Sequence, residues 1–245
     1  RTLFSGPKWL RRSKERWRRF LLFTFSLPTL PKPYRGSQSY LEPLQKWGVA
    51  LSSSLAPAYR PDPVALKSIA GHNLAKDSKV WALAPSAAWP MKRWPVEHFK
   101  KLILLLPEHR FVVLGGPQDL FCEELRATAP ERVQNFAGQL SLAESLALIT
   151  QCQGLISADT GLMHGADQMG VRVLALIGPT AFGFPYFKNS TVLDVELDCR
   201  PCTKDGRGRC SQKVYQKCMV DITPERVAQE VLRQEQQHFP IFEKT

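Results

Sequence analysis

The sequence GLISADTGLMH at residues 154–164 passes from an apolar run through Asp-Thr-Gly into an amphipathic segment. We expect a buried strand followed by a helix, with Asp159 or Thr160 accepting the helix's free N–H groups. Gly161 lets the backbone approach a ligand closely. The N–H groups of the first helical turn and the helix dipole suit a diphosphate. The same residues also fit an ordinary capped helix that binds nothing.

Outward from this stretch, short apolar runs alternate with amphipathic segments. This alternation predicts an α/β fold, in which a parallel sheet carries helices on both faces. Ligands of such sheets bind at the carboxyl ends of the strands, where the Asp-Thr-Gly segment lies. We expect strands at 80–84, 111–114, 133–136, 154–157, 173–177 and 192–195, and helices at 39–47, 96–106, 120–127, 142–150, 162–169 and 224–234.

A second segment, PSAAWPMKRWP at residues 85–95, follows the first predicted strand of this sheet. It should therefore face the same crevice. It offers small residues, among them Ser86 and Ala87, and then the cations Lys92 and Arg93. Lysine is a compact point charge that suits phosphate. The alternative is a solvated pair of loop cations.

Further motifs follow in order: Leu-Gly-Gly-Pro at 114–117, Ala-Gly at 137–138, Ser-Leu-Ala-Glu at 141–144 and Gly-Pro-Thr at 178–180. The tail, Cys-Met followed by Ile-Thr-Pro-Glu-Arg-Val, ends the set at residues 218–227. Together with the two segments above, it resembles the ADP-heptose:lipopolysaccharide heptosyltransferases, glycosyltransferase family 9. The resemblance covers roughly residues 80–235.

The resemblance implies a GT-B fold, in which two Rossmann-like domains face each other across a cleft. The C-terminal domain of such enzymes binds the nucleotide-sugar, and the N-terminal domain holds the acceptor side and a catalytic aspartate. We expect residues 1–63 to be a remnant of the acceptor domain plus a linker. Residues 64–245 are then the donor-binding domain, with a cysteine-rich insert at 199–218.

The resemblance also assigns the donor site. Asp159, Thr160 and Gly161 match residues that bind the ADP part, and Lys92 matches a lysine that contacts the donor's phosphate or sugar. Asp119 stands where the family often has a glutamate that holds the ribose. The full set expected at the donor is Ser86, Ala87, Lys92, Asp119, Asp159, Thr160, Gly161, Leu162 and His164.

The chain departs from the family pattern in two respects. The family usually has glycine where Ser86 stands, and serine or threonine near Ala88, so one hydroxyl that could donate to phosphate is missing. By the resemblance, we also expect most of the first domain to be absent from these 245 residues, and with it the segment that should carry the general base. Lys92 is therefore the one residue to which we assign a catalytic role, stabilisation of the departing diphosphate.

Four cysteines, Cys199, Cys202, Cys210 and Cys218, fall within twenty residues and are surrounded by lysine and arginine. Four thiolates suit a tetrahedral zinc or iron site, and nearby cations favour thiolate. Related clusters occur in the heptosyltransferase family, and this resemblance implies a structural ion. We expect that catalysis requires no cofactor. Reduced free thiols and disulfides are the alternatives.

The charge balance favours an anionic partner, since 33 Lys+Arg stand against 22 Asp+Glu, a net charge of +11. Basic residues and aromatic residues are interleaved over residues 1–20, which indicates either a solvated helix face or contact with anionic lipid heads. The apolar run at 20–27 is shorter than the roughly twenty residues that span a bilayer. We expect a cytoplasmic protein that is peripheral to the inner membrane.

Three functions compete on these observations. The first is an inverting glycosyltransferase that moves heptose from ADP-heptose to a lipopolysaccharide core or other glycan acceptor, although the fragment alone could be inactive. The second is a truncated or degenerate homologue that binds a nucleotide-sugar or glycan without turnover. The third, a basic zinc-finger protein, lacks a recognition helix, and we expect no nucleic-acid partner.

Overall fold

The computed structural model describes residues 10–49, 59–72, 74, 79–180 and 182–236. Within them, six strands form one sheet: β1 (Lys79–Ala84), β2 (His109–Val113), β3 (Val133–Asn135), β4 (Gly154–Ala158), β5 (Val173–Leu176) and β6 (Ser190–Leu193). The helices are α1 (Arg16–Phe25), α2 (Gly36–Leu41), α3 (Pro63–Ile69), α4 (Val96–Leu105), α5 (Cys122–Thr128), α6 (Leu142–Ile149), α7 (Gly161–Gln168), α8 (Lys217–Val220) and α9 (Pro224–Gln236), with 3-10 turns η1 (Glu42–Trp47) and η2 (Pro90–Lys92).

The strands run in the order β3-β2-β1-β4-β5-β6, and every neighbouring pair is parallel. Chain order reverses direction between β1 and β4, because the chain first builds outward through β2 and β3 and then returns to the other side of β1. Leu83 of β1 lies in register with Val113 of β2 and with Ile156 of β4. The crevice above the carboxyl ends of β1 and β4 is the position where such sheets bind ligands.

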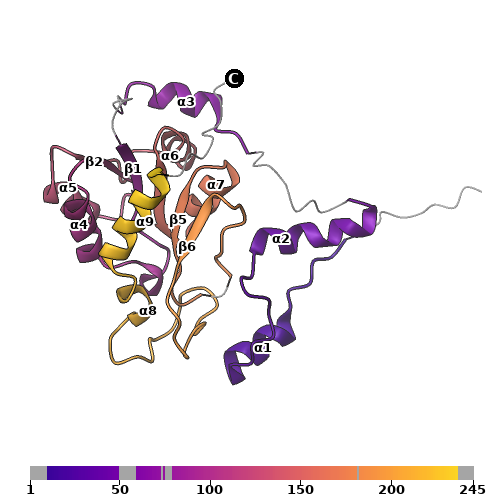
Figure 1. The fold of residues 1–245 in the computed structure, drawn as a ribbon. Helices are drawn as coiled ribbons and strands as arrows, with labels where there is room; N and C mark the ends of the chain where they lie inside the picture. The colour runs from indigo at the N-terminus through magenta and orange to yellow at the C-terminus, as the bar shows by residue number, and fades with distance from the viewer. Residues whose placement is uncertain (1–9, 50–58, 73, 75–78, 181, 237–245) are drawn as a thin grey trace, which may run out of the picture.

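Helices cover both faces of the sheet (Figure 1). On one face, Trp81 and Leu83 of β1 pack with residues of α4, α5, α8 and α9. On the other face, Val80 and Ala82 pack with residues of α3, α6 and α7. Alternate side chains of a strand point to opposite faces, so a strand with both sets apolar must be covered twice. The predicted α/β architecture is confirmed.

The predicted segments differ from the structure at the periphery. The helix expected over 39–47 is instead α2 followed by η1, and Pro43, which lacks an N–H, stands at the start of η1. The last strand begins at Ser190 rather than at 192. Helix α3 was not predicted, although Asp62 accepts from the Val64 N–H and Pro63 opens the helix.

The N-terminal segment packs beside the edge formed by β6 and the loop that precedes it (Figure 1). Arg35 forms an isolated antiparallel bridge with Gly183. The ring of Phe182 lies edge-on to Tyr34 at 5.2 Å and to Phe23 at 5.9 Å. Residues 1–9 and 50–58 of the predicted acceptor-domain remnant lie outside the described residues.

Candidate functional site

The carboxyl ends of β1, β2 and β4 gather the predicted site residues. The loop after β1 carries Ser86 and Lys92, the loop after β2 carries Asp119, and Asp159 follows β4 directly. Because the strands are parallel and paired in register, these loops emerge at the same edge of the sheet. The prediction that the two sequence segments face one crevice is met by the contacts described next.

Asp159 is the centre of one group of side chains. Its Oδ2 lies 3.1 Å from Lys92 Nζ and accepts a hydrogen bond from Thr180 Oγ1, also at 3.1 Å. Its Oδ1 lies 3.4 Å from His164 Nε2. The side chains of Lys92 and Asp159 are 13% and 17% exposed, so the pair is largely withdrawn from water.

The electrostatics of Asp159 follow from these partners. Burial raises the pKa of this carboxyl, but the hydrogen bond from His164 and the positive charge of Lys92 outweigh it and lower the pKa to about 2. Asp159 is therefore ionised at neutral pH and holds Lys92 in place beside the start of α7. Lys92 thus stands ready for an incoming anion that can compete with, or join, this carboxylate.

Thr160, rather than Asp159, caps α7. Its Oγ1 accepts from the Met163 N–H at 3.2 Å and shares a hydrogen bond with Ser157 Oγ at 2.9 Å. The carboxylate of Asp159 is consequently left for Lys92. The next residue, Gly161, is exposed, and a β-carbon added there would meet no atom within 4 Å. The first turn of α7 therefore presents its backbone toward open space.

Asp119 is the centre of a second group. Its Oδ1 accepts from Ser86 Oγ at 2.6 Å, and its Oδ2 accepts from the Gly116 N–H at 2.8 Å. Arg93 lies 3.9 Å from the same carboxylate and donates to the carbonyl of Ala87 at 3.0 Å. The predicted residues Ser86, Ala87 and Asp119 are thus linked, and together they fix the loop after β1 to the loop after β2.

Two residues of α7, the predicted Leu162 and the neighbouring Gly165, have a structural setting. Leu162 packs against the core on the α7 side of the sheet. Gly165, an unexpected choice inside a helix, is explained by packing, because a β-carbon there would stand 2.6 Å from a methyl group of Leu146 on α6. His164, in contrast, is 45% exposed beside Asp159 and remains accessible to a ligand.

Sequence reasoning missed residues that reach the site from later in the chain. Thr180 belongs to the Gly-Pro-Thr motif, which follows β5, yet only the structure shows its hydrogen bond to Asp159. Gly183 lies against the carboxylate of Asp159, and Gly206 lies against the stem of Lys92. The motif spacing carries no signal for either glycine, because both contacts depend on how two long loops fold back.

The four cysteines of the insert are free thiols that lie near one another. Burial, together with the neighbouring Cys202, Cys199 and Cys210, raises the pKa of Cys218 to about 11, while Arg200 acts to lower it. The described residues nevertheless contain no group of three or more His, Cys, Asp or Glu side chains placed to hold a metal ion. The predicted zinc or iron site is therefore not formed in this arrangement.

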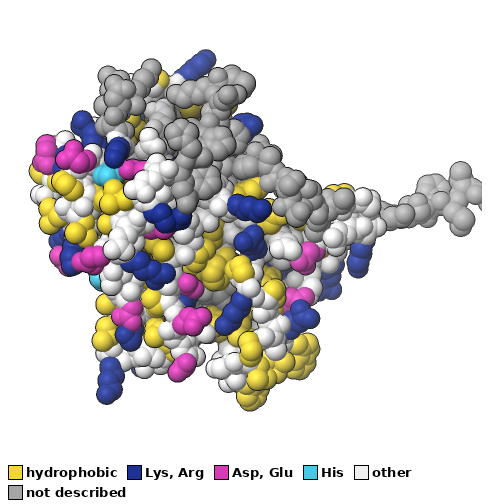
Figure 2. All heavy atoms as spheres, in the orientation of Figure 1, with side chains coloured by type: hydrophobic (Ala, Val, Ile, Leu, Met, Phe, Trp, Pro, Cys, Tyr) yellow, Lys and Arg dark blue, Asp and Glu magenta, His cyan; other side chains and the backbone are white. Residues whose placement is uncertain are grey.

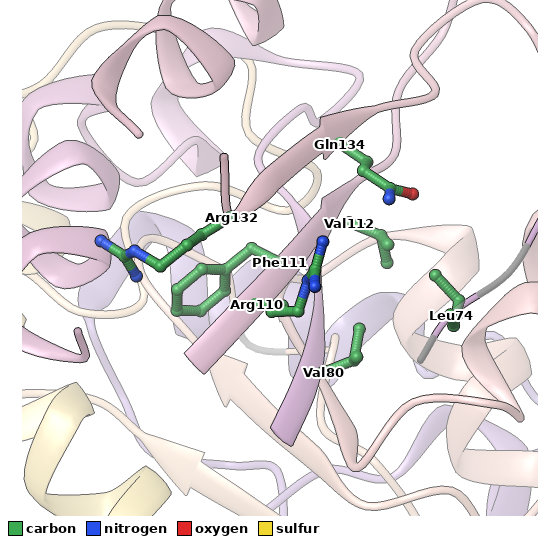
Figure 3. A pocket seen from close by; sticks show the side chains of 7 residues that line it. All are labelled: Leu74, Val80, Arg110, Phe111, Val112, Arg132 and Gln134. Carbon is green, nitrogen blue, oxygen red and sulfur yellow. The ribbon is translucent and has the colours of Figure 1, made fainter. Parts of the chain in front are cut away.

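A small pocket at the amino ends of the strands, away from this site, is not a second candidate for ligand binding. It opens beside the first residues of β1 and β2, where Figure 3 shows Arg110 and Arg132 among its lining. The guanidinium of Arg132 donates to the backbone carbonyls of Leu106, His109 and Ile103. That cation is thus engaged in holding the chain together at the amino ends of the strands.

None of the helices in the described part of the chain combines the length and apolarity that crossing a bilayer requires.

Comparison with known sequences gives a consistent result. The sequence model of glycosyltransferase family 9 (heptosyltransferase) matches residues 44–212. Lipooligosaccharide heptosyltransferase 2 of Haemophilus ducreyi is 32% identical over 151 residues, which are 58% of this chain and 43% of that protein. Lipopolysaccharide heptosyltransferase 2 of Escherichia coli is 28% identical over 169 residues, 65% of this chain and 47% of that protein. The chain spans about half the length of the curated relatives it matches.

Solved structures agree with the fold. The Escherichia coli ADP-heptose lipopolysaccharide heptosyltransferase II superposes with a TM-score of 0.59 at 25% identity, covering 75% of this chain and 55% of that one. A glycosyl transferase of family 9 from Veillonella parvula gives a TM-score of 0.63 at 24% identity, covering 82% of this chain and 60% of that one. The second likeness concerns the fold alone.

Proposed function

This chain belongs to glycosyltransferase family 9, the heptosyltransferases, and we propose that it is the donor-binding half of an inverting glycosyltransferase. The donor is ADP-heptose, and the acceptor is a lipopolysaccharide core sugar. The observation that carries the proposal is the Lys92–Asp159 pair beside the uncovered first turn of α7. The printed names of the relatives, which are lipopolysaccharide and lipooligosaccharide heptosyltransferases, support the choice of substrates.

The chemistry follows from charge. When the bond between the sugar and the diphosphate breaks, both electrons of that bond stay on the diphosphate oxygen, and the acceptor oxygen bonds to the sugar carbon from the opposite face. A base removes the acceptor's proton; we assign no residue of this chain to that task. Lys92 and the free N–H groups at the start of α7 stabilise the leaving diphosphate, since they are fixed before the charge develops.

The roles of the remaining residues are part of the same proposal. Asp159 orients Lys92 and His164, and Thr160 fixes the turn from which Gly161 offers its N–H. Ser86 and Asp119 shape the wall formed by the loops after β1 and β2, where the ribose is held. No cofactor takes part in this scheme.

Calorimetric titration tests the proposal. The full chain is titrated with ADP, ADP-heptose and UDP, and the titration is repeated on Asp159→Ala. Glu131→Ala, at an exposed position before β3, is the matched control. We expect ADP to bind in preference to UDP, the control to match the wild-type chain, and Asp159→Ala to lose most of the affinity.

Two outcomes separate the alternatives. A folded wild-type chain that binds none of the three nucleotides contradicts the donor-site proposal. If the chain binds ADP-heptose but transfers no heptose to a lipopolysaccharide acceptor that lacks core heptose, it is a homologue that binds without turnover. This alternative is also compatible with a match to only about half the length of the relatives.

Membrane contact is a separate part of the proposal. Hydrophobic side chains gather over α1 in Figure 2. Trp17, Phe20 and Phe25 are 78%, 49% and 60% exposed, and Arg16 and Arg18 on the same helix are exposed too. We propose that this face touches the anionic cytoplasmic surface of the inner membrane. Sedimentation with phosphatidylglycerol vesicles, compared with neutral vesicles, tests it, and equal binding to both or to neither contradicts it.

We also propose that the cysteine-rich insert binds a structural zinc or iron ion. Four thiols, three in the loop after β6 and Cys218 on α8, are a suitable donor set, and the effect of the other three on the pKa of Cys218 indicates that they are neighbours. An ion would have to draw them closer than they stand here. Metal analysis of the purified chain and zinc titration of Cys202→Ser test this. Absence of bound metal together with no stoichiometric zinc uptake contradicts it.

A further inference from the structure

The cysteine-rich insert lies directly on the donor site, which none of its motifs predicts. Its first part is fixed to the turn after β5 by Arg200, which donates to the carbonyls of Gly178 at 2.8 Å and Ile177 at 3.0 Å. The N–H groups of Cys202 and Thr203 both donate to Pro179. The insert is thereby held beside Thr180, which itself contacts Asp159.

The loop at 203–207 then crosses to the segment after β1. Gly206 has a φ of +96°, and a β-carbon there would stand 2.7 Å from Lys92 Cγ and 3.0 Å from Trp89 Cβ. Only glycine fits both the backbone conformation and the space. Gln216, farther along the insert, donates to the carbonyl of Pro90. The insert therefore forms a wall beside the stem of Lys92.

The wall carries a cation, Arg207, whose guanidinium N–H groups face water and can donate to a ligand. The guanidinium of Arg207 lies 4.5 Å from the centre of the Trp89 ring. Its own side chain is 67% exposed, and Asp205 lies at 3.5 Å, a weak surface pairing. The backbone carbonyl of Arg207 accepts from the buried Thr203 hydroxyl at 2.6 Å, which fixes the turn from which the side chain departs.

Lys92 and Arg207 differ in how their charge is compensated. Lys92 is 13% exposed and paired with Asp159, so the carboxylate already compensates much of its positive charge. A nucleoside diphosphate-sugar carries a negative charge on each phosphate, and one more unit develops on the leaving group. An arginine fork suits phosphate oxygens because it can donate two parallel hydrogen bonds.

We propose that Arg207 is a second cation of the donor site, which stacks on the Trp89 ring and binds the diphosphate of the nucleotide-sugar. This inference rests on the proposed donor site at Lys92 and Asp159. It assigns a ligand-binding role to the cysteine-rich insert through the loop that presents Arg207.

The test compares ADP with adenosine, which lacks both phosphates, by calorimetry on the full chain. We expect Arg207→Ala to weaken ADP binding about tenfold, as for loss of one charge-assisted hydrogen bond, and to leave adenosine binding unchanged. Arg207→Lys should restore part of the loss. Arg209→Ala, an exposed arginine of the same insert, is the matched control and should bind ADP as the wild-type chain does.

Each outcome has a distinct meaning. If the wild-type chain binds ADP and Arg207→Ala binds it equally well, the role of Arg207 is refuted and the donor site stands. If Arg207→Ala and Arg209→Ala weaken ADP binding by the same factor, the loss comes from the lower net positive charge of the insert, and a specific contact of Arg207 with the diphosphate is refuted. If the folded wild-type chain does not bind ADP at all, both proposals fail together. Thermal unfolding of each variant shows that the comparison is made on folded protein.

Discussion

Gly183 lies so close to Asp159 that a β-carbon added to it would stand 2.0 Å from Asp159 Cγ. The contact joins two parts of the chain, because Gly183 also pairs with Arg35 of the N-terminal segment. The neighbouring ring of Phe182 packs against Tyr34. The N-terminal segment thus contacts the loop that lies against Asp159, at the centre of the proposed donor site.

Gly183→Ala should displace the Asp159 carboxylate, since the new methyl group and the carboxyl carbon cannot occupy the same space. We expect ADP affinity to fall at least tenfold and the melting temperature to decrease, measured by calorimetric titration and thermal unfolding. Gly71→Ala is the control, because a β-carbon at Gly71 meets no atom within 4 Å. Unchanged ADP binding by Gly183→Ala would show that the site tolerates a displaced Asp159.

Gly161→Ala should separate folding from binding. The added methyl group would point into open space at the first residue of α7, and alanine favours helix over glycine by about 1 kcal/mol. We expect unfolding in urea to show equal or greater stability, while ADP binding weakens because the methyl group obstructs the diphosphate. If stability and binding both stay at the wild-type level, the donor does not approach the start of α7.

The stability contributed by Asp159 should depend on pH. Its pKa of about 2 in the folded chain lies below the value of about 3.9 in an unfolded one, so the contribution is fully present above pH 4 and is lost as the pH falls toward 2. The difference corresponds to roughly 2 to 3 kcal/mol. Urea unfolding of the wild-type chain and Asp159→Asn should therefore differ by about this amount at pH 6 and converge near pH 2.

Lys92→Met checks the cause of that pH dependence. Removing the cation should raise the pKa of Asp159 toward its unfolded value and shrink the pH-dependent part of the stability, because burial then acts with less opposition. A pH profile identical to that of the wild-type chain would mean that Lys92 does not sustain the low pKa of Asp159.

Asp167, at the end of α7, should be needed for the loop that carries Gly183. It is 1% exposed, and its carboxylate accepts from the N–H groups of Tyr186 at 2.8 Å and Phe187 at 3.1 Å and from Ser190 Oγ at 2.6 Å. Asp167→Ala leaves three donors without this acceptor. We expect a loss of roughly 3 kcal/mol in urea unfolding.

Asp167→Asn is the companion variant, because its carbonyl oxygen can still accept some of these hydrogen bonds. We expect it to lose less stability than Asp167→Ala. Equal losses would indicate that the negative charge matters more than the number of acceptors, and no loss in either variant would contradict the anchoring role.

The alternation of apolar and amphipathic segments was sufficient to predict the layered fold, and the ordered motifs were sufficient to predict the family. Strand β4 and helix α7, for example, fall within one or two residues of their predicted bounds. The prediction was weaker where proline and short length obscure periodicity. The seven-residue α3 and the pair α2 and η1 show this, since a helix with few turns offers few repeats of the pattern.

Sequence by itself determined which residues stand at the ends of strands, because strand periodicity and chain order place Lys92, Asp119 and Asp159 at one edge of a parallel sheet. Tertiary structure alone decided their partners. The oxygen of Asp159 that Thr180 reaches, and the contacts of Gly183 with Asp159 and of Gly206 with Lys92, depend on loops that fold back across the sheet. The physical reason is range: periodicity and capping are set by neighbours a few residues away, whereas the field and the space around a charge are set by whichever distant segments pack against it.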